Sequence, residues 1–199
     1  YVKDPKPGMY DWVASFDLNS LYPHLIMQYN ISPETLVDER HPHATVDKML
    51  DKDIEVGKYC VCANGAQYRK DKHGFLPEMM KKIYDERVIY KKKMIAAKKK
   101  YEKTKDKALL DDISAFNNNQ MARKIQLNSA YGAIGNQYFR YYNLRNAEAI
   151  TYGGQFSIRW IENKMNVYLN RVLKTKGEDY VIASDTDSIY LNMGPLVET

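Results

Sequence analysis

The sequence has few of the residues that cross-link chains or hold zinc. It contains two cysteines and four histidines in 199 residues. Cys60 and Cys62 lie one residue apart, which disfavours a disulfide between them, and two thiolates alone do not complete a structural zinc site. The histidines match no metal-ligand spacing. We therefore expect free thiols in a reducing compartment rather than a fold stabilised by disulfides or zinc.

Long apolar runs are missing as well. Uninterrupted apolar stretches extend for only a few residues, as at Leu25–Met27, whereas a membrane-spanning helix needs roughly 20. Residues 1–5 carry charge and proline where a secretory signal would have its apolar core. The chain also begins without methionine. We expect a non-secreted chain without membrane contact that is a fragment of a longer protein.

The composition excludes wholesale disorder. Hydrophobic residues make up 44% of the sequence and charged residues 28%, both ordinary for globular proteins. The sequence shows no internal repeat. Its 199 residues correspond to one domain, or to one domain with an insertion.

Positive charge is concentrated in one block. The formal net charge is +5, but Lys81–Lys107 contains twelve Lys or Arg against four Asp or Glu, a net of +8. The rest of the chain carries the difference, which is −3. Such a block suggests a polyanionic partner, although a solvated, lysine-rich helix surface would look the same.

The middle of the chain predicts a pair of long helices. We expect them at about Pro77–Thr104 and Leu109–Ala133, joined by the polar segment Lys103–Lys107 into a helical hairpin. The first helix is predicted from apolar residues that recur every three or four positions, which are Met80, Ile83, Tyr84, Val88 and Ile95.

The two flanking parts predict mixed structure. A helix is expected over Ala149–Leu173, and two short strands are expected around an acidic turn within Tyr180–Leu191. The remaining expected elements are a strand at Trp12–Phe16, a helix at Ser20–Tyr29, and a strand at Tyr59–Cys62 closed by an Asn64-Gly65 turn.

Two aspartates in the acidic turn are candidate metal ligands. Asp185 and Asp187 are two residues apart, so on an extended chain their carboxylates point the same way and repel. A divalent cation would balance them, and oxygen ligands favour Mg²⁺ or Mn²⁺. An exposed acidic turn without a metal is the commoner meaning of a lone Asp-x-Asp. Asp17, at the end of a predicted strand, is a further candidate, or else a helix cap.

The predicted hairpin carries polar residues at helical spacing. Lys124, Asn128 and Tyr131 are i, i+4 and i+7 and share a face, where they could meet a phosphate, a sugar edge and a base. Arg87 and Lys91 are i and i+4, and two cations on one face suggest a shared anionic ligand. Ordinary surface polarity is the alternative for both groups.

Three segments, taken in order, resemble motifs A, B and C of family B DNA polymerases. They are Asp17-x-x-Ser20-Leu21-Tyr22-Pro23, Lys124-x-x-x-Asn128-Ser129-x-Tyr131-Gly132 and Asp185-Thr186-Asp187-Ser188. Residues 30–35 and 139–147 resemble the T4-type bacteriophage replicative polymerases within this family. The resemblance extends over nearly the whole chain.

The resemblance implies an α+β fold with two subdomains. Residues 1–66 and 137–199 would form a palm with an antiparallel sheet and packed helices, and residues 67–136 would form a helical-hairpin fingers subdomain. The implied activity is that of a DNA-directed DNA polymerase in phage replication. It would transfer a nucleotide from a dNTP to a primer 3′-hydroxyl by a two-metal mechanism.

The resemblance also implies a role for each site residue. Asp17, Asp187 and Lys124 would be catalytic, with Lys124 a candidate proton donor to pyrophosphate. Two Mg²⁺ ions, or Mn²⁺, would be held by Asp17, the Leu18 carbonyl, Asp185 and Asp187. The nucleotide would contact Ser20, Leu21, Tyr22, Arg87, Lys91, Lys124 and Asn128, with Tyr22 excluding a 2′-hydroxyl. DNA would contact Tyr131, Gly132 and Thr186.

The implied partners are primer–template DNA, dNTPs and parts of the polymerase outside these 199 residues. Those parts are the exonuclease, the thumb and a clamp-binding tail, so we expect the fragment alone to be inactive. The implied location is the cytoplasm of an infected bacterium. Two features depart from the family pattern, since Ala183-Ser184 replaces the usual Tyr-Gly and His24 replaces a small residue.

Three alternatives stay open at this point. One is a palm enzyme that uses ribonucleotides or an RNA template, against which Tyr22 argues. Another is an inactivated nucleic-acid-binding scaffold, which would not need Asp17, Asp187, Lys124 and Arg87 together. The last is a basic helical-hairpin interaction module with incidental carboxylates.

Overall fold

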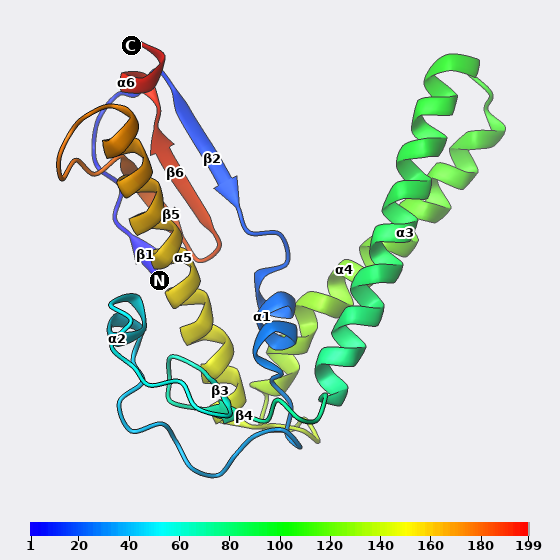
Figure 1. Cartoon of the computed structure of the whole chain (residues 1–199). Coiled ribbons are helices and arrows are strands. Elements are labelled where there is room, and N and C mark those ends of the chain that lie inside the picture. The colour runs from blue at the N-terminus through cyan, green and yellow to red at the C-terminus, as the bar shows by residue number, and fades with distance from the viewer. Residues whose placement is uncertain (199) are drawn as a thin grey trace.

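Two arms rise from a common base and diverge from each other (Figure 1). The computed structural model describes residues 1–198. One arm is an antiparallel sheet with a long helix on one face, and the other is a pair of long helices. The predicted combination of helices with an antiparallel sheet, the α+β class, is confirmed.

The sheet arm joins the two ends of the chain. Its four strands are in the order β1-β5-β6-β2 and all neighbours are antiparallel. The strands are β1 (Val2–Lys3), β5 (Val181–Asp185), β6 (Ser188–Asn192) and β2 (Val13–Asp17). Helix α5 (Leu144–Val172) covers one face, where Ile158 packs with Val181, Ile189 and Leu191 in a buried cluster. Burying these side chains fixes the register between strands from opposite ends of the sequence.

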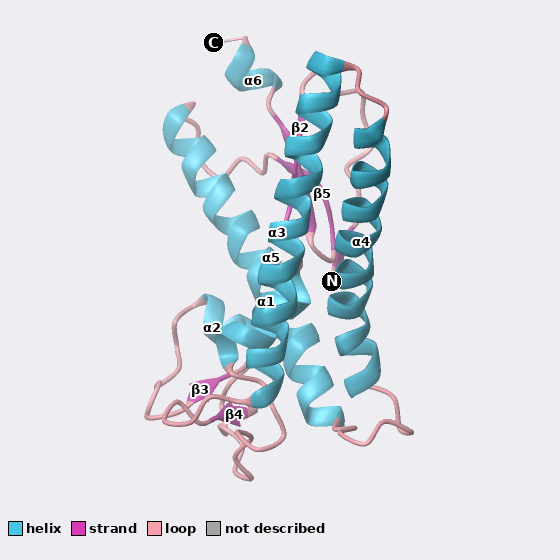
Figure 2. Ribbon diagram, turned by 90° about the vertical axis from the view of Figure 1, so that its right-hand side faces the viewer, coloured by secondary structure: helices cyan, strands magenta, loops and turns pink. Residues whose placement is uncertain are grey.

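The hairpin arm consists of α3 (Phe75–Thr104) and α4 (Ala108–Ile134), which run side by side (Figure 2). Both predicted helices are therefore confirmed to within two residues. The chain reverses at Lys105, whose left-handed backbone, with φ 56°, ends α3. Arg123 of α4 holds the arm together, because its guanidinium lies 4.4 Å from the Tyr90 ring centroid and its Nε donates to Glu86 at 2.9 Å.

The base is an apolar core where the arms meet. Helix α1 (Leu21–Tyr29) lies between α5 and the hairpin, and buries Leu25 and Ile26 against residues of the other helices such as Met80, Leu127 and Ile150. Below it lies a two-stranded hairpin of β3 (Cys60–Val61) and β4 (Gln67–Tyr68), which confirms the strand and turn predicted there.

Some elements are absent from the sequence-based prediction. They are β1, α2 (Val46–Leu50), β4 and α6 (Gly194–Val197). Helix α5 also begins at Leu144, five residues before the predicted start at Ala149. The reason is Asn143, whose side chain accepts a hydrogen bond from the Asn146 N–H at 3.1 Å and caps the helix early.

A polar segment before the hairpin caps its first turn. Glu34 accepts a hydrogen bond from the Phe75 N–H at 2.6 Å, and Asn30 accepts one from the Gly74 N–H at 2.9 Å. Ser32 accepts a longer one from the Leu76 N–H at 3.4 Å. The first N–H groups of a helix have no partner within the helix. Residues 30–34 supply hydrogen-bond acceptors for these N–H groups and so anchor α3 to the base.

Two expectations from the composition concerned free thiols and membrane-spanning helices. Cys60 and Cys62 are both free thiols, and burial raises the pKa of the Cys62 thiol. Among the helices of residues 1–198, none combines the length and apolarity needed to cross a membrane.

Candidate active site

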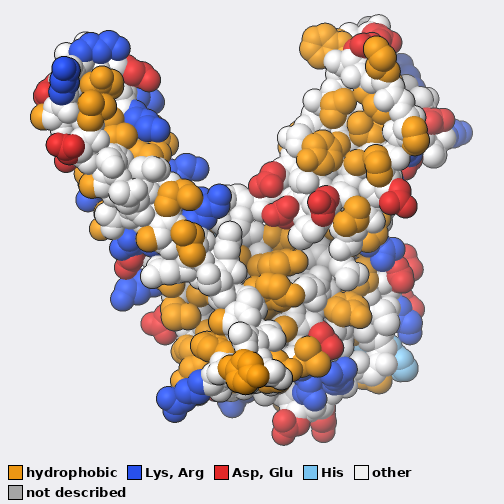
Figure 3. All heavy atoms as spheres, turned by 180° about the vertical axis from the view of Figure 1, so that it is seen from behind, with side chains coloured by type: hydrophobic (Ala, Val, Ile, Leu, Met, Phe, Trp, Pro, Cys, Tyr) orange, Lys and Arg blue, Asp and Glu red, His pale blue; other side chains and the backbone are white. Residues whose placement is uncertain are grey.

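A pocket of about 500 Å³ lies where the sheet arm, α1 and the hairpin arm converge. The space-filling view shows a hollow between the two arms (Figure 3). Acidic side chains gather on the side of the hollow formed by the sheet arm, and basic side chains gather on the side formed by the hairpin arm. The pocket is lined by Asp17, Asn19, Ser20, Leu21, Tyr22, Pro23, Arg87, Lys124, Asn128, Tyr131, Thr186 and Asp187.

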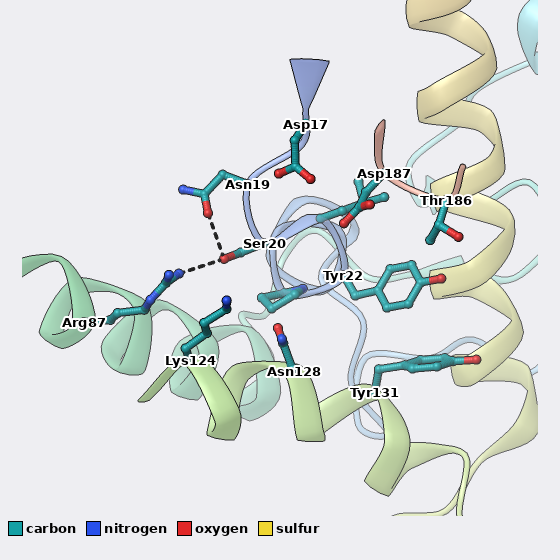
Figure 4. A pocket seen from close by; sticks show the side chains of 12 residues that line it. Asp17, Asn19, Ser20, Tyr22, Arg87, Lys124, Asn128, Tyr131, Thr186 and Asp187 are labelled. Carbon is teal, nitrogen blue, oxygen red and sulfur yellow. Dashed lines mark hydrogen bonds between the residues drawn. The ribbon is translucent and has the colours of Figure 1, made fainter. Parts of the chain in front are cut away.

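Two aspartates that are 170 positions apart in the sequence meet at the end of the sheet. Asp17 is the last residue of β2 and pairs with Ser188 in β6, which places it beside Asp187 in the turn before β6. The Leu18 N–H donates to the Asp187 carbonyl at 2.8 Å and fixes this arrangement. Figure 4 shows both carboxylates on the pocket side of their segments. The pairing of β2 with β6 therefore brings the first and third motifs together.

The aspartate pair is electrostatically uncompensated. Partial burial raises the pKa of the Asp187 carboxyl, and the negative charges of Asp17 and Asp185 raise it further. No Lys, Arg or His in the described part of the chain forms an ion pair with any of these three. Paired carboxylates without a counter-charge fit a hard divalent cation, for which oxygen is the preferred ligand.

Few side chains at the end of the sheet could act as metal ligands. No group of three or more His, Cys, Asp or Glu within residues 1–198 is arranged to hold a metal ion. Asp185 is exposed and its Oδ1 accepts from the Thr186 hydroxyl at 2.9 Å. The side-chain ligands available in this conformation are thus Asp17 and Asp187, and a cation there would need oxygen ligands from the substrate, water or backbone as well.

Cations from the hairpin face the carboxylates across the pocket. Arg87 comes from α3, and Lys124 and Asn128 come from successive turns of α4 (Figure 4). The Arg87 Nη1 donates to the Ser20 hydroxyl at 3.2 Å. Its Nε is buried and has no hydrogen-bond partner among the described residues. A buried donor of this kind is costly unless a ligand satisfies it, so it points to an anion.

The floor of the pocket is the N-terminal end of α1. Ser20 precedes the helix with φ 54°, a left-handed conformation that a non-glycine residue seldom adopts, and no side chain caps the helix. The first N–H groups of α1 are therefore left for an outside acceptor. Helix N-termini bind anions through such groups and through the helix dipole.

Two tyrosines form the wall below the carboxylates. The Tyr22 and Tyr131 rings have centroids 4.8 Å apart and planes tilted by 54°. Gly154 of α5 makes room for Tyr22, since a Cβ at that position would lie 3.3 Å from the ring. Burial, with Tyr131 and Asp187 nearby, raises the pKa of the Tyr22 hydroxyl. The phenol therefore stays neutral at physiological pH.

Most of the predicted site residues lie at this pocket. The structure brings together residues from all three motifs, and leaves four predicted residues outside the lining: Leu18, Lys91, Asp185 and Gly132. Lys91 is exposed on α3, about one helical turn beyond Arg87. Two lining residues were missed. Asn19, whose Oδ1 accepts from the Ser20 hydroxyl at 3.3 Å, and Pro23 both stand inside the first motif, which was the signal available for them.

Comparison with known proteins gives a consistent result. The family described as DNA polymerase family B matches residues 1–196. A DNA-directed DNA polymerase of Escherichia phage RB69 is 36% identical over 242 aligned residues, covering 100% of this chain and 27% of the phage protein. The DNA-directed DNA polymerase of Enterobacteria phage T4 is also 36% identical, with the same coverage. A DNA polymerase of Pyrococcus glycovorans is 33% identical over 96% of this chain and 20% of its own length. The chain thus spans about a quarter of the length of its phage relatives, at 27%.

Proposed function

The chain belongs to the family B DNA polymerases, and from this premise we propose that it is the nucleotidyl-transfer core of a phage replicative polymerase. The two phage relatives confirm the predicted resemblance to the T4-type polymerases. The observation that carries the proposal is one pocket in which Asp17 and Asp187 face Arg87 and Lys124 across the N-terminus of α1.

The two subdomains are proposed along the division of the chain that the family resemblance implies. Residues 1–66 and 137–199 form the palm in this proposal, and residues 67–136 form the fingers. The sheet with α5 supports the first assignment, and the long α3–α4 hairpin supports the second. The hollow between the arms is where substrate and primer–template DNA would lie.

The metal site is proposed at the end of the sheet. Asp17 and Asp187 would hold two Mg²⁺ ions, or Mn²⁺, with the Leu18 carbonyl as a further ligand. Asp185, which lies outside the pocket lining, would be a supporting ligand after its side chain turns toward the pocket. Bound there, the metals would neutralise charge on the attacking and leaving oxygens of an in-line displacement. The unbalanced charge of the carboxylate pair supports this assignment. The protein's own contribution is to hold the two carboxylates at a fixed separation through the β2–β6 pairing.

The triphosphate is proposed to lie between α1 and the hairpin. The N–H groups at the start of α1, with Ser20, Leu21 and Tyr22, would face its oxygens. Arg87 and Lys124 would neutralise the β- and γ-phosphates, and Lys91 would come into reach when the fingers close. The primer 3′-hydroxyl would lose its proton to solvent, and its oxygen would form a bond to the α-phosphorus as the bond to the bridging oxygen breaks. Lys124 would give a proton to the departing pyrophosphate.

The tyrosine wall is proposed to read the sugar and the base pair. Tyr22 would lie under the sugar and exclude a 2′-hydroxyl by its bulk. Asn128 would contact the nucleotide, and Tyr131 and Gly132 the nascent base pair. Thr186, in the turn between the strands, would contact the primer terminus. The neighbouring Tyr22 and Tyr131 rings support a shared role for these residues.

Several components of the complete enzyme are proposed on the family resemblance alone. They are a proofreading exonuclease, a thumb and a tail for a sliding clamp. The enzyme would act in the cytoplasm of the infected bacterium, and the 199-residue chain alone would polymerise little or not at all.

Metal-dependent nucleotide binding tests the proposal. The complete parent polymerase is titrated with a dNTP with and without Mg²⁺ on a dideoxy-terminated primer–template, beside Asp187→Asn and the control Asp51→Asn. Asp51 is exposed and outside the pocket. We expect Mg²⁺ to tighten binding for parent and control and to have little effect on Asp187→Asn. A dNTP affinity of the parent that does not change with Mg²⁺ would favour a basic interaction module instead.

A further inference from the structure

His24, in the first turn of α1, contacts both the residue that precedes this helix and the hairpin arm. It is the fourth residue of α1, and its Nδ1 is 2.9 Å from the Ser20 carbonyl oxygen. Its ring meets the Tyr84 ring of α3 edge-on, with centroids 4.7 Å apart and planes at 82°. His24 does not line the pocket, so its connection to the site runs through Ser20.

The contact with Ser20 shows which group is the hydrogen-bond donor at Nδ1 of His24. A carbonyl oxygen only accepts hydrogen bonds, so Nδ1 must carry the proton in this contact. The same carbonyl also accepts from the His24 backbone N–H at 3.1 Å. Two donors from one residue thus hold the Ser20 carbonyl in line with the helix.

Holding this carbonyl sets the direction of the next N–H. The peptide unit is planar and trans, so the Leu21 N–H points opposite to the Ser20 carbonyl, out of the N-terminal end of α1. That is the end which forms the pocket floor. Ser20 is also held in a left-handed conformation, which persists only where the surroundings impose it. The imidazole contacts the carbonyl of this same residue.

A set of contacts links the start of α1 to the hairpin arm at this point. Arg87 donates to the Ser20 hydroxyl, and Tyr84 stands three residues before it on the same helix. The set runs from Ser20 through His24 and Tyr84 to Arg87 and back to Ser20. A shift of α3 therefore acts on the Ser20 peptide through the imidazole as well as through the guanidinium.

We propose that His24 is a positioning residue for nucleotide binding, which orients the Ser20–Leu21 peptide through its Nδ1–H and supports that orientation against α3 through Tyr84. The inference rests on the proposed function, because it assumes that the end of α1 receives the triphosphate. His24 itself touches no substrate in this proposal.

Three substitutions separate the hydrogen bond from the ring. His24→Asn keeps a donor near the position of Nδ1 and loses the ring. His24→Phe keeps a ring against Tyr84 and loses the donor, and His24→Ala loses both. His43→Ala is the control, since His43 is exposed in a loop away from the pocket. The assay is single-nucleotide extension by the complete parent polymerase, with KM for the dNTP and kcat measured separately.

We expect His24→Ala and His24→Phe to raise the dNTP KM by about 2- to 10-fold, the value of one net hydrogen bond, while primer–template affinity is unchanged. His24→Asn should restore most of the loss, and His43→Ala should match the parent. An unchanged KM in His24→Ala would overturn the inference. So would rescue by Phe but not by Asn, because the imidazole would then act by packing alone.

A second measurement does not depend on activity. The ¹⁵N NMR spectrum of histidine-labelled parent polymerase, assigned with His24→Asn, reports which ring nitrogen carries the proton. We expect protonated Nδ1, and a neutral ring with its proton on Nε2 would contradict the contact with Ser20. A parent enzyme that shows this proton but extends no primer would refute the proposed function instead, so the two failures are distinguishable.

Discussion

Gly74 offers a steric test of how the hairpin is attached to the base. In Gly74→Ala the new Cβ would lie 2.6 Å from the Ser32 Cβ and 3.2 Å from the Pro77 Cδ. Carbon atoms in contact are normally about 3.5–4.0 Å apart, so the first contact is about 1 Å too short. Gly74 has φ −80°, which any residue adopts, and the effect is therefore one of space rather than backbone conformation.

The expected cost follows from these contacts. Ser32 is fully buried and cannot move away without disturbing the Leu76 cap. Overpacking costs about 1–3 kcal/mol and a weakened hydrogen bond about 1 kcal/mol, so the first turn of α3 should lose about 2–4 kcal/mol. At about 1.4 kcal/mol for each factor of ten, amide protection there should fall by about 30- to 1,000-fold.

Hydrogen–deuterium exchange of the complete polymerase measures this directly, in peptides that cover residues 74–80. Gly57→Ala is the matched control, since a Cβ at Gly57 would meet nothing within 4 Å. We expect the control to exchange as the parent does. Parental protection in Gly74→Ala would show that the base tolerates displacement of Ser32, and the anchoring role of residues 30–34 would have to be abandoned.

Three further predictions concern the pocket. Tyr22→Ala should raise incorporation of ribonucleotides relative to deoxynucleotides, measured by competitive primer extension, and an unchanged ratio would remove Tyr22 from sugar selection. Arg87→Ala should weaken dNTP binding in pre-steady-state kinetics by about 10- to 100-fold, which is the value of a charged hydrogen bond. The dNTP affinity of Arg87→Lys should lie between those of Arg87→Ala and the parent. Equal dNTP binding by all three proteins would refute the assignment of Arg87 to the triphosphate. The raised pKa of Asp187 means that its ionised form is disfavoured in the folded chain. Without metal, Asp187→Asn should therefore be more stable than the parent at neutral pH. This gain in stability should disappear as the pH falls through the pKa of Asp187 in the folded chain, which lies above the ordinary 3.8. Thermal melts of both proteins in EDTA across pH 4–7 check the sign, and a variant less stable than the parent at pH 7 would contradict it.

Local sequence signals predicted the elements that depend on local chemistry. The α3–α4 hairpin followed from apolar spacing and from a polar link, both of which act within one helix. The β5–β6 hairpin followed from apolar arms around an acidic turn. By contrast, β1 is two residues long and exists only because Val2 and Lys3 pair with β5 at the far end of the chain. A strand of that kind has no local signature.

The candidate site was predictable in its residues and not in its contacts. Motif order identified Asp17, Lys124 and Asp187, but their meeting depends on the long-range pairing of β2 with β6 and on how α4 packs against α1. The role of Gly74 and the contact between His24 and Tyr84 depend on packing between segments distant in sequence. The assignment of Lys91 stays a prediction, because helical spacing shows that two cations share a face but not how far a pocket extends along it.

Primer extension by the complete parent polymerase tests the central claim most directly. The parent, Asp187→Asn and the control Asp51→Asn are assayed with Mg²⁺, dNTPs and a primed template, with primer–template affinity measured in parallel. The account predicts extension by the parent and the control and near-complete loss in Asp187→Asn, with DNA binding retained by all three. Extension unaffected in Asp187→Asn would contradict the metal assignment, and no extension by a parent that still binds primer–template would identify an inactivated nucleic-acid-binding scaffold.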